Sequence, residues 1–171
     1  MVLNGNSLKK YLSKNQLVEN GIIENIHSSS YDVTSDNFVL KFTTFTHSIN
    51  LCDANTLDQM YQKTDIENGY LLKPQECILV PLIDNFNIPD NICAHIRGRT
   101  SFNRLGLSIS LQHLNPGYKG KLNIAITNNS PNTYELLPNM RIAQIVFETM
   151  DNKVSEDLLY YNESTPVYYN E

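Results

Sequence analysis

One segment of the chain combines phosphate-binding side chains with a backbone suited to the same task. Arg97-Gly98-Arg99-Thr100-Ser101 follows an apolar run and precedes residues 102–105, which can form a helical turn. A helix start exposes free backbone N–H groups, and its dipole favours an anion. Thr100 and Ser101 add hydroxyl donors, and Arg99 and Arg104 add charge. The segment predicts a phosphate site, although the simpler interpretation is that its hydroxyls only cap the helix.

A second segment, 121–127, alternates like a strand, and one residue breaks its polar face. Leu122, Ile124 and Ile126 share one face. The other face carries Lys121, Asn123, Ala125 and Thr127. Ala125 is therefore the one apolar residue on a polar face, and the pattern alone predicts no more than a small residue on a strand.

These segments must be positioned by a strand-rich framework. Short apolar or alternating runs predict strands at 37–45, 70–72, 77–82, 92–96, 108–111, 122–127, 134–137 and 142–147. Residues 85–91 are turn-like, with Pro89 fixing the backbone. A short helix capped by Asn6-Ser7 is expected near the N-terminus, and Leu57, Met60 and Tyr61 have the spacing of a surface helix. Many short strands between turns predict an all-β sandwich or barrel.

Bulk properties narrow the class of protein. The chain of 171 residues fits a single domain, 1–171, in which 1–68 elaborates the barrel and 150–171 forms a tail. A net charge of −5, with 13 basic against 18 acidic residues, argues against general nucleic-acid binding. We expect no signal peptide and no membrane span. Three cysteines without CxxC spacing favour reduced thiols and a cytoplasmic location, and no metal-ligand cluster is evident.

The order and spacing of several motifs resemble the dCTP deaminase/dUTPase superfamily. Gly98-Arg99-Thr100-Ser101-Phe102-Asn103-Arg104-Leu105-Gly106-Leu107 is similar to the family segment G-R-S-S-L-x-R-L-G-L. Leu114-Asn115-Pro116-Gly117-Tyr118-Lys119-Gly120 resembles I-D-P-G-[WYF]-x-G, and Asn139-Met140-Arg141-Ile142-Ala143-Gln144 resembles G-x-R-I-A-Q. Residues 26–33, with Ser30-Tyr31-Asp32, resemble I-x-P-A-S-Y-D-L, whose core we interpret as structural. The resemblance covers essentially the whole chain.

The resemblance implies a dUTPase-like distorted, jelly-roll-like β-barrel with short helices, assembled as a homotrimer with pockets at subunit interfaces. It assigns phosphate binding to Arg99, Thr100, Ser101, Arg104 and Gln144. It assigns the base and sugar pocket to Ser110, Leu111, Gln112, His113, Asn115 and Tyr118. Tyr161, Tyr168 and Tyr169 would form a lid over the pocket of a neighbouring subunit. The simpler alternative is that this tail docks as a strand on its own barrel.

Both signature carboxylates of the superfamily are replaced. Asn115 stands where dUTPases carry a catalytic Asp, and Ala125 stands where dCTP deaminases carry a catalytic Glu. Asn115 can donate and accept hydrogen bonds but cannot act as a general base. His113 is the best candidate for a substitute base or a base-stacking contact, and we interpret His27, His47 and His95 as structural.

Three hypotheses follow. The first is a catalytically degenerate protein that binds dCTP, dUTP, dTTP or a related nucleotide to sense, sequester or regulate, for example in conflict between phage and host. The second is an active dCTP deaminase, dUTPase or both, with a non-standard base. The third is a trimeric protein-interaction module with a vestigial pocket and an unknown protein partner. We expect no tightly bound cofactor, with Mg²⁺ accompanying a nucleotide phosphate, and no membrane contact.

Overall fold

Two β-sheets form most of the molecule. The computed structural model describes residues 1–49 and 59–159. Its larger sheet runs β4 (Tyr61–Asp65), β3 (Phe38–Phe42), β6 (Cys77–Asn87), β10 (Lys119–Asn128) and β8 (Leu107–Ile109), with β1 (Leu17–Glu19) also paired to β6. The second sheet runs β2 (Tyr31–Thr34), β12 (Arg141–Thr149), β7 (Ile92–Gly98) and β9 (His113–Leu114). Every pairing between these strands is antiparallel.

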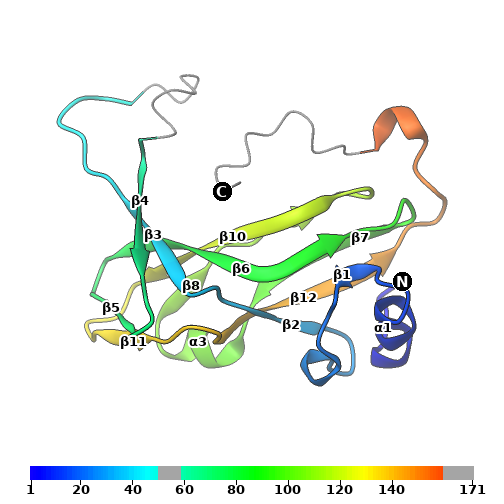
Figure 1. Cartoon of the computed structure of the whole chain (residues 1–171), viewed down its shortest axis with the longest axis horizontal. Helices are drawn as coiled ribbons and strands as arrows, with labels where there is room; N and C mark the ends of the chain where they lie inside the picture. The colour runs from blue at the N-terminus through cyan, green and yellow to red at the C-terminus, as the bar shows by residue number, and fades with distance from the viewer. Residues whose placement is uncertain (50–58, 160–171) are drawn as a thin grey trace.

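Small elements complete the framework (Figure 1). Helix α1 (Gly5–Leu12) buries Leu8 and Leu12, and the short helix α3 (Thr100–Arg104) connects β7 to β8. Strands β5 (Tyr70–Leu72) and β11 (Tyr134–Leu136) form a separate two-stranded ladder. Two single turns, η1 (Ile23–Asn25) and η2 (Glu156–Leu158), lie in the connections.

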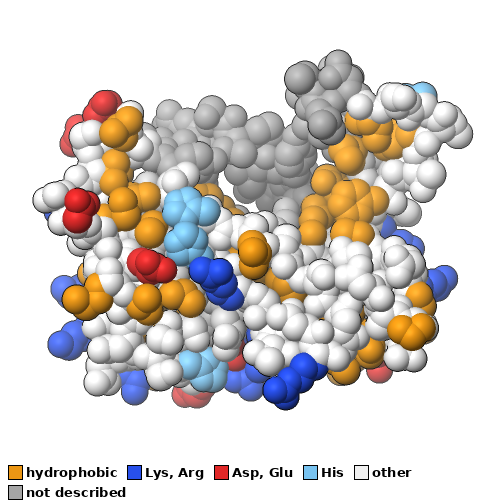
Figure 2. Space-filling model, turned by 180° about the vertical axis from the view of Figure 1, so that it is seen from behind, with side chains coloured by type: hydrophobic (Ala, Val, Ile, Leu, Met, Phe, Trp, Pro, Cys, Tyr) orange, Lys and Arg blue, Asp and Glu red, His pale blue; other side chains and the backbone are white. Residues whose placement is uncertain are grey.

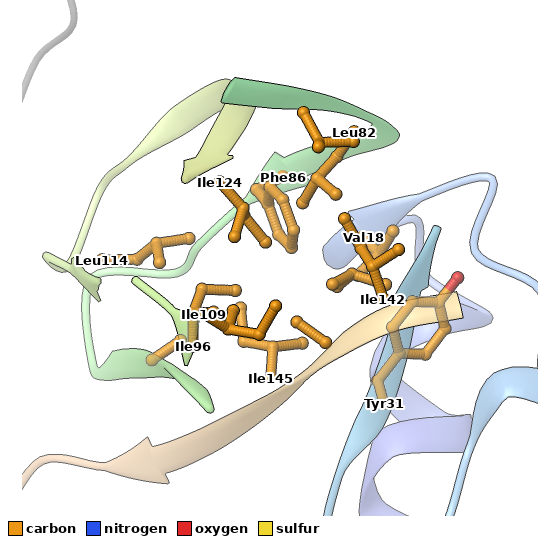
Figure 3. Packing of buried hydrophobic residues seen from close by; sticks show 14 of the residues in the cluster. Val18, Tyr31, Leu82, Phe86, Ile96, Ile109, Leu114, Ile124, Ile142 and Ile145 are labelled. Carbon is orange, nitrogen blue, oxygen red and sulfur yellow. The ribbon is translucent and has the colours of Figure 1, made fainter. Parts of the chain in front are cut away.

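The hydrophobic core lies between the two main sheets. In Figure 3, Leu82, Phe86 and Ile124 of the larger sheet point toward Ile96, Ile142 and Ile145 of the second sheet. Each of these side chains is at most 1% exposed. Strand alternation explains most of the pattern, because every second residue of β7 faces inward, as do Ala143, Ile145 and Phe147 of β12. A register shift between Arg141 and Ala143 interrupts the alternation, so Ile142 is buried as well. The outward residues between the inward ones are therefore free to build a site.

A buried polar link joins β2 to β6 within this core. Asp84 accepts hydrogen bonds from the Tyr31 hydroxyl at 3.1 Å and from the Thr34 backbone N–H at 2.7 Å. Burial raises the pKa of Asp84, and burial together with the Asp84 charge raises the pKa of Tyr31 to about 12. Because a buried carboxylate is stabilised by such donors, this link fixes β2 at one position against the larger sheet.

The all-β architecture is confirmed, and the strands predicted at 70–72, 92–96, 122–127 and 142–147 are present. Three local predictions are wrong. The N-cap of α1 is Asn4, whose side chain accepts from Ser7 N–H, and not Asn6-Ser7. Tyr61 begins β4 and pairs with Phe42, so no helix includes it, while Leu57 lies outside the described residues. Residues 85–87 continue β6, because β10 and β1 pair with them.

Candidate functional site

The predicted phosphate segment lies at the end of β7, where the chain turns into α3. Arg99 is the N-cap residue, and its carbonyl accepts from the N–H groups of Phe102 and Asn103. Phe102 is buried and anchors the helix, whereas Thr100, Ser101 and Arg104 are exposed. The predicted helical turn is thus confirmed, and its hydroxyls and charged groups face solvent.

Asp32 gathers four side chains from three separate segments of the chain. This carboxylate on β2 is fully buried, and its Oδ2 lies 3.0 Å from His27 Nε2, 3.7 Å from Arg99 Nη2 and 3.7 Å from Arg141 Nη1. Its Oδ1 accepts from Gln144 Nε2 at 3.3 Å. Arg99 is also held by a hydrogen bond from Nη1 to the carbonyl of Arg141 at 2.6 Å. Two residues predicted to bind phosphate, Arg99 and Gln144, therefore meet at one carboxylate.

The charge of this Asp32 cluster is positive. Two arginines face a single carboxylate, and the side chains of Arg99 and Arg141 are 29% and 48% exposed while that of Asp32 is 0% exposed. Coulomb attraction orders the guanidinium groups, since Asp32 cannot move into solvent. The arrangement presents ordered, partly exposed donors with a net positive charge to an anion.

The sequence interpretation missed three residues of this region. His27 was interpreted as structural, and Arg141 and Arg97 were given no role at the phosphate site. Backbone pairing places Asp32 and Arg97 on either side of Gln144, on the outward face of the second sheet. Arg97 is exposed, and no hydrogen bond or ion pair to its side chain occurs among residues 1–49 and 59–159. The signal that could have found the cluster was Asp32 itself, a charged residue between Tyr31 and Val33.

The base-pocket segment runs through β9 and into β10. Ser110 and Ala125 are joined twice, from Ser110 N–H to the Ala125 carbonyl at 2.9 Å and from Ala125 N–H to Ser110 Oγ at 3.0 Å. Gln112 Nε2 donates to the Asn123 carbonyl at 2.7 Å, while Gln112 Oε1 is buried without a hydrogen-bond partner. Leu111 is 69% exposed. This segment therefore holds an unsatisfied amide oxygen and an exposed apolar side chain close together in the chain.

Asn115 lies at a tight turn between β9 and β10. Its carbonyl accepts from Tyr118 N–H at 3.1 Å, and Gly117 has φ 82°. Proline followed by a glycine with positive φ is the signature of a type II turn. The Tyr118 hydroxyl donates to the Lys121 carbonyl at 2.8 Å and fixes the turn to β10. Asn115 is exposed at this turn, and its side chain is an amide that does not ionise.

Ala125 lies on the outward face of β10, as the alternation predicts. Asn123, Ala125 and Thr127 are partly exposed, whereas Ile124 and Ile126 are buried. A β-bulge between Lys121 and Asn123 interrupts the register with β6. The side chains at 123, 125 and 127 are an amide, a methyl group and a hydroxyl, so this face supplies no carboxylate for proton transfer.

His113 is exposed on β9, and its ring contacts that of His95 on β7. Other predicted residues cannot be placed, because Tyr161, Tyr168 and Tyr169 lie outside the described residues. Strand β7 lies between the two regions, since it pairs with β12, which carries Arg141 and Gln144, and with β9, which carries His113.

Metal-binding clusters and membrane-spanning helices are both absent from the described residues. Residues 1–49 and 59–159 contain no group of three or more His, Cys, Asp or Glu side chains arranged to hold a metal ion. In the same ranges, no helix has both the length and the apolar character needed to cross a membrane.

Comparison with known proteins identifies relatives of the whole chain. The model of the dCTP deaminase-like family matches residues 2–150. The chain is 28% identical over 155 residues to a dUMP-forming dCTP deaminase of Sulfurihydrogenibium sp. (strain YO3AOP1), covering 90% of this chain and 86% of that protein. It is 30% identical over 179 residues to a dUMP-forming dCTP deaminase of Dictyoglomus turgidum, covering 100% of this chain and 91% of that one.

Solved structures share the fold at lower identity. A 2′-deoxycytidine 5′-triphosphate deaminase from Agrobacterium tumefaciens aligns with a TM-score of 0.71 and 17% identity, over 85% of this chain. This chain spans 46% of that longer one. A mutant dUTPase from phage phi11 of S. aureus aligns with a TM-score of 0.53 and 16% identity, covering 89% of this chain and 95% of that one. These matches confirm the dUTPase-like fold expected from the motifs.

Proposed function

The chain belongs to the dCTP deaminase-like family, and from this premise we propose that it binds a pyrimidine deoxynucleotide, or a related nucleotide, without the family's hydrolytic chemistry. The observation that carries the proposal is the meeting of Arg99 and Gln144 at buried Asp32, beside the start of α3. These residues come from two separate family motifs. Their convergence retains an anion site, whereas Asn115 and Ala125 remove the groups that would move protons.

In this proposal, the Asp32 cluster and α3 bind the phosphate groups. Arg99 and Arg141 supply guanidinium donors, Thr100 and Ser101 supply hydroxyls, and Gln144 supplies an amide. Arg104 adds charge at the last turn of α3. Mg²⁺ would arrive with the nucleotide, because phosphate oxygens are its usual ligands in proteins.

In this proposal, residues 110–118 bind the base and the sugar. Buried Gln112 Oε1 has no hydrogen-bond partner, and an unsatisfied buried acceptor is costly unless a donor reaches it. Leu111 offers an apolar surface for a ring, and His113 offers a stacking face. As the family resemblance implies, we propose that these residues face the Asp32 cluster of a neighbouring copy across the interfaces of a homotrimer.

Two positions of the chain lack a side chain able to transfer protons. Deamination of a cytosine ring needs a group that accepts a proton from attacking water and returns it to the leaving amine. The methyl group of Ala125 cannot do so, and the Asn115 amide does not ionise. The protein would then hold its ligand unchanged, which suits sensing, sequestration or regulation.

An active enzyme is the second candidate, and the relatives named as dUMP-forming dCTP deaminases favour it. In that case His113, two residues before Asn115, is the candidate substitute base. His113→Gln would abolish turnover of dCTP in an active enzyme, whereas it would change binding alone in a degenerate one.

Calorimetric titration with dCTP, dUTP and dTTP in the presence of Mg²⁺ tests the binding proposal. We expect saturable binding of at least one nucleotide and a loss of about tenfold or more in affinity for Arg99→Ala, which removes a charged donor. Lys153→Ala is the matched control, because Lys153 pairs with Asp90 in an exposed loop. Absence of binding, or equal affinity of Arg99→Ala, would contradict the proposal and favour an interaction module.

Restoring the two missing carboxylates tests whether their loss has removed the catalytic activity. A protein carrying both Ala125→Glu and Asn115→Asp should gain dCTP or dUTP turnover over the unchanged chain. Asn123→Glu together with Asn115→Asp is the matched control, because residue 123 lies on the same strand face two positions away. Equal turnover of the two variants would show that position 125 has no special place in the pocket.

A further inference from the structure

His95 and His113 lie opposite one another on the neighbouring antiparallel strands β7 and β9. The next pair along the ladder is hydrogen-bonded, since Ile96 N–H donates to the Gln112 carbonyl at 2.9 Å. Hydrogen-bonded and non-hydrogen-bonded pairs alternate in antiparallel ladders. His95 and His113 therefore form a non-hydrogen-bonded pair, the type that brings opposite side chains closest together.

The two imidazoles present the same ring nitrogen to each other. Their Nδ1 atoms are 3.4 Å apart, the ring centroids are 4.8 Å apart and the ring planes are inclined by 49°. A good hydrogen bond from N–H is shorter, at about 2.7–3.2 Å. Two histidine nitrogens bound to one tetrahedral ion, at about 2.0–2.1 Å each, stand about 3.3–3.4 Å apart. The observed separation fits a shared ion better than a direct hydrogen bond.

We propose that His95 and His113 form a binding site for one divalent transition-metal ion, bound through both Nδ1 atoms. Imidazole nitrogen suits Zn²⁺, Cu²⁺ and Ni²⁺, whereas Mg²⁺ prefers oxygen ligands. The site is accessible, because His113 is exposed and His95 is partly exposed. In Figure 2, histidine side chains meet at the surface of the molecule. With two protein ligands, the remaining coordination positions are filled by solvent, so the ion is exchangeable.

Positive and negative charges near the two histidines offset one another. The affinity for the ion must therefore come from its bonds to the two imidazole nitrogens. Arg97 and Cys93 lie two residues to either side of His95 on the same face of β7. Across β12, the backbone partner of Cys93 is Glu148, that of His95 is Val146 and that of Arg97 is Gln144. The positive charge of Arg97 opposes a cation and the negative charge of Glu148 favours it.

Cys93 does not extend the site. No third His, Cys, Asp or Glu joins the pair within the part of the chain that the structure describes. The inference is therefore a two-histidine site, and it does not depend on nucleotide binding.

The test is a zinc titration of the full chain after removal of metal by a chelator. We expect saturable Zn²⁺ binding and a weakening of about tenfold or more for His95→Gln and for His113→Gln, each of which removes one of two ligands. His47→Gln is the matched control, because His47 packs against Phe45 away from the pair. Unchanged affinity in either pair variant would overturn the proposal, as would competition by millimolar Mg²⁺.

A second measurement needs no variant. Nitrogen NMR of the histidine rings in the unchanged protein should show Zn²⁺-dependent shifts of Nδ1 in both His95 and His113, with no such shift in His47. A shift confined to one of the two rings, or to Nε2 atoms, would overturn the shared site.

Discussion

At the scale of single residues, Asp32 is the feature on which the proposed phosphate site depends. It is fully buried, yet it faces two arginines, a histidine and an amide. A buried carboxylate is tolerated only with such partners. Its role is therefore to order Arg99 and Gln144 before any ligand arrives, which reduces the entropy lost on binding.

Replacing Asp32 tests this ordering role. Asp32→Asn should destabilise the fold by about 2–3 kcal/mol, because charge-assisted contacts are lost and Arg99 and Arg141 then face one another without a carboxylate. That loss corresponds to a fall in Tm of about 4–12 °C for a chain of this size. Thermal unfolding followed by circular dichroism checks it. Asp90→Asn, which removes an exposed pair with Lys153, should change Tm by less than about 2 °C; an equal fall in both variants would contradict the role of Asp32.

At the scale of elements, the contact between β2 and β6 makes the free energy of unfolding fall at alkaline pH. The pKa of Tyr31 is raised to about 12 in the folded chain, against an ordinary value near 10. Between these values the unfolded chain loses the phenolic proton while the folded chain keeps it. Folding stability must therefore fall as pH rises through this window.

Tyr31→Phe removes this linkage. The variant should be less stable than the unchanged chain at pH 8, because Asp84 loses a donor and Ile22 N–H loses an acceptor. Between pH 9.5 and 11.5 the difference in unfolding free energy should shrink, since only the unchanged chain loses stability through Tyr31. Urea unfolding at a series of pH values measures it. A difference that is constant across this range would rule out the raised pKa as its cause.

The end of α3 requires glycine at one position. Gly106 follows the helix with φ 80°, and a Cβ there would lie 3.0 Å from Ser130 Cβ. Gly106→Ala should cost about 1 kcal/mol or more in unfolding free energy, because side chains disfavour a left-handed backbone. Gly98→Ala is the matched variant, since a Cβ there meets only the end of the Asn103 side chain at 3.0 Å and then Ile109 at 3.4 Å. Chemical unfolding should rank Gly106→Ala as the more harmful, and the reverse order would contradict this account.

At the scale of the whole molecule, the proposed homotrimer can be tested directly. The Asp32 cluster and β9 lie on opposite sides of β7 in the second sheet, and the proposal places the nucleotide pocket at an interface between copies. Sedimentation equilibrium should give three times the chain mass of 19.5 kDa. A mass of one chain at all concentrations would contradict an interface pocket.

Much of the fold could be predicted, because its information is local. Alternation across Leu122, Ile124 and Ile126 predicts β10 without any partner. Asn139 stands at the glycine position of its motif, and its φ is positive at 59°. Tyr61 could not be assigned locally, since its helical spacing is overridden by pairing with Phe42, whose ring lies 5.1 Å away. The roles of Asp32 and Arg141 were missed for the same reason, because they depend on contacts such as Gln144–Asp32, which are 112 residues apart in the chain.

The central claim is that a nucleotide is bound but not converted. Purified protein would be incubated with dCTP and with dUTP in the presence of Mg²⁺, and the nucleotides would be resolved by chromatography at nucleotide concentrations that saturate binding. The account predicts that both nucleotides are recovered unchanged while at least one is bound. Formation of dUTP or dUMP at ordinary enzymatic rates, about 1 s⁻¹ or faster, would contradict it and would make His113 the first residue to replace.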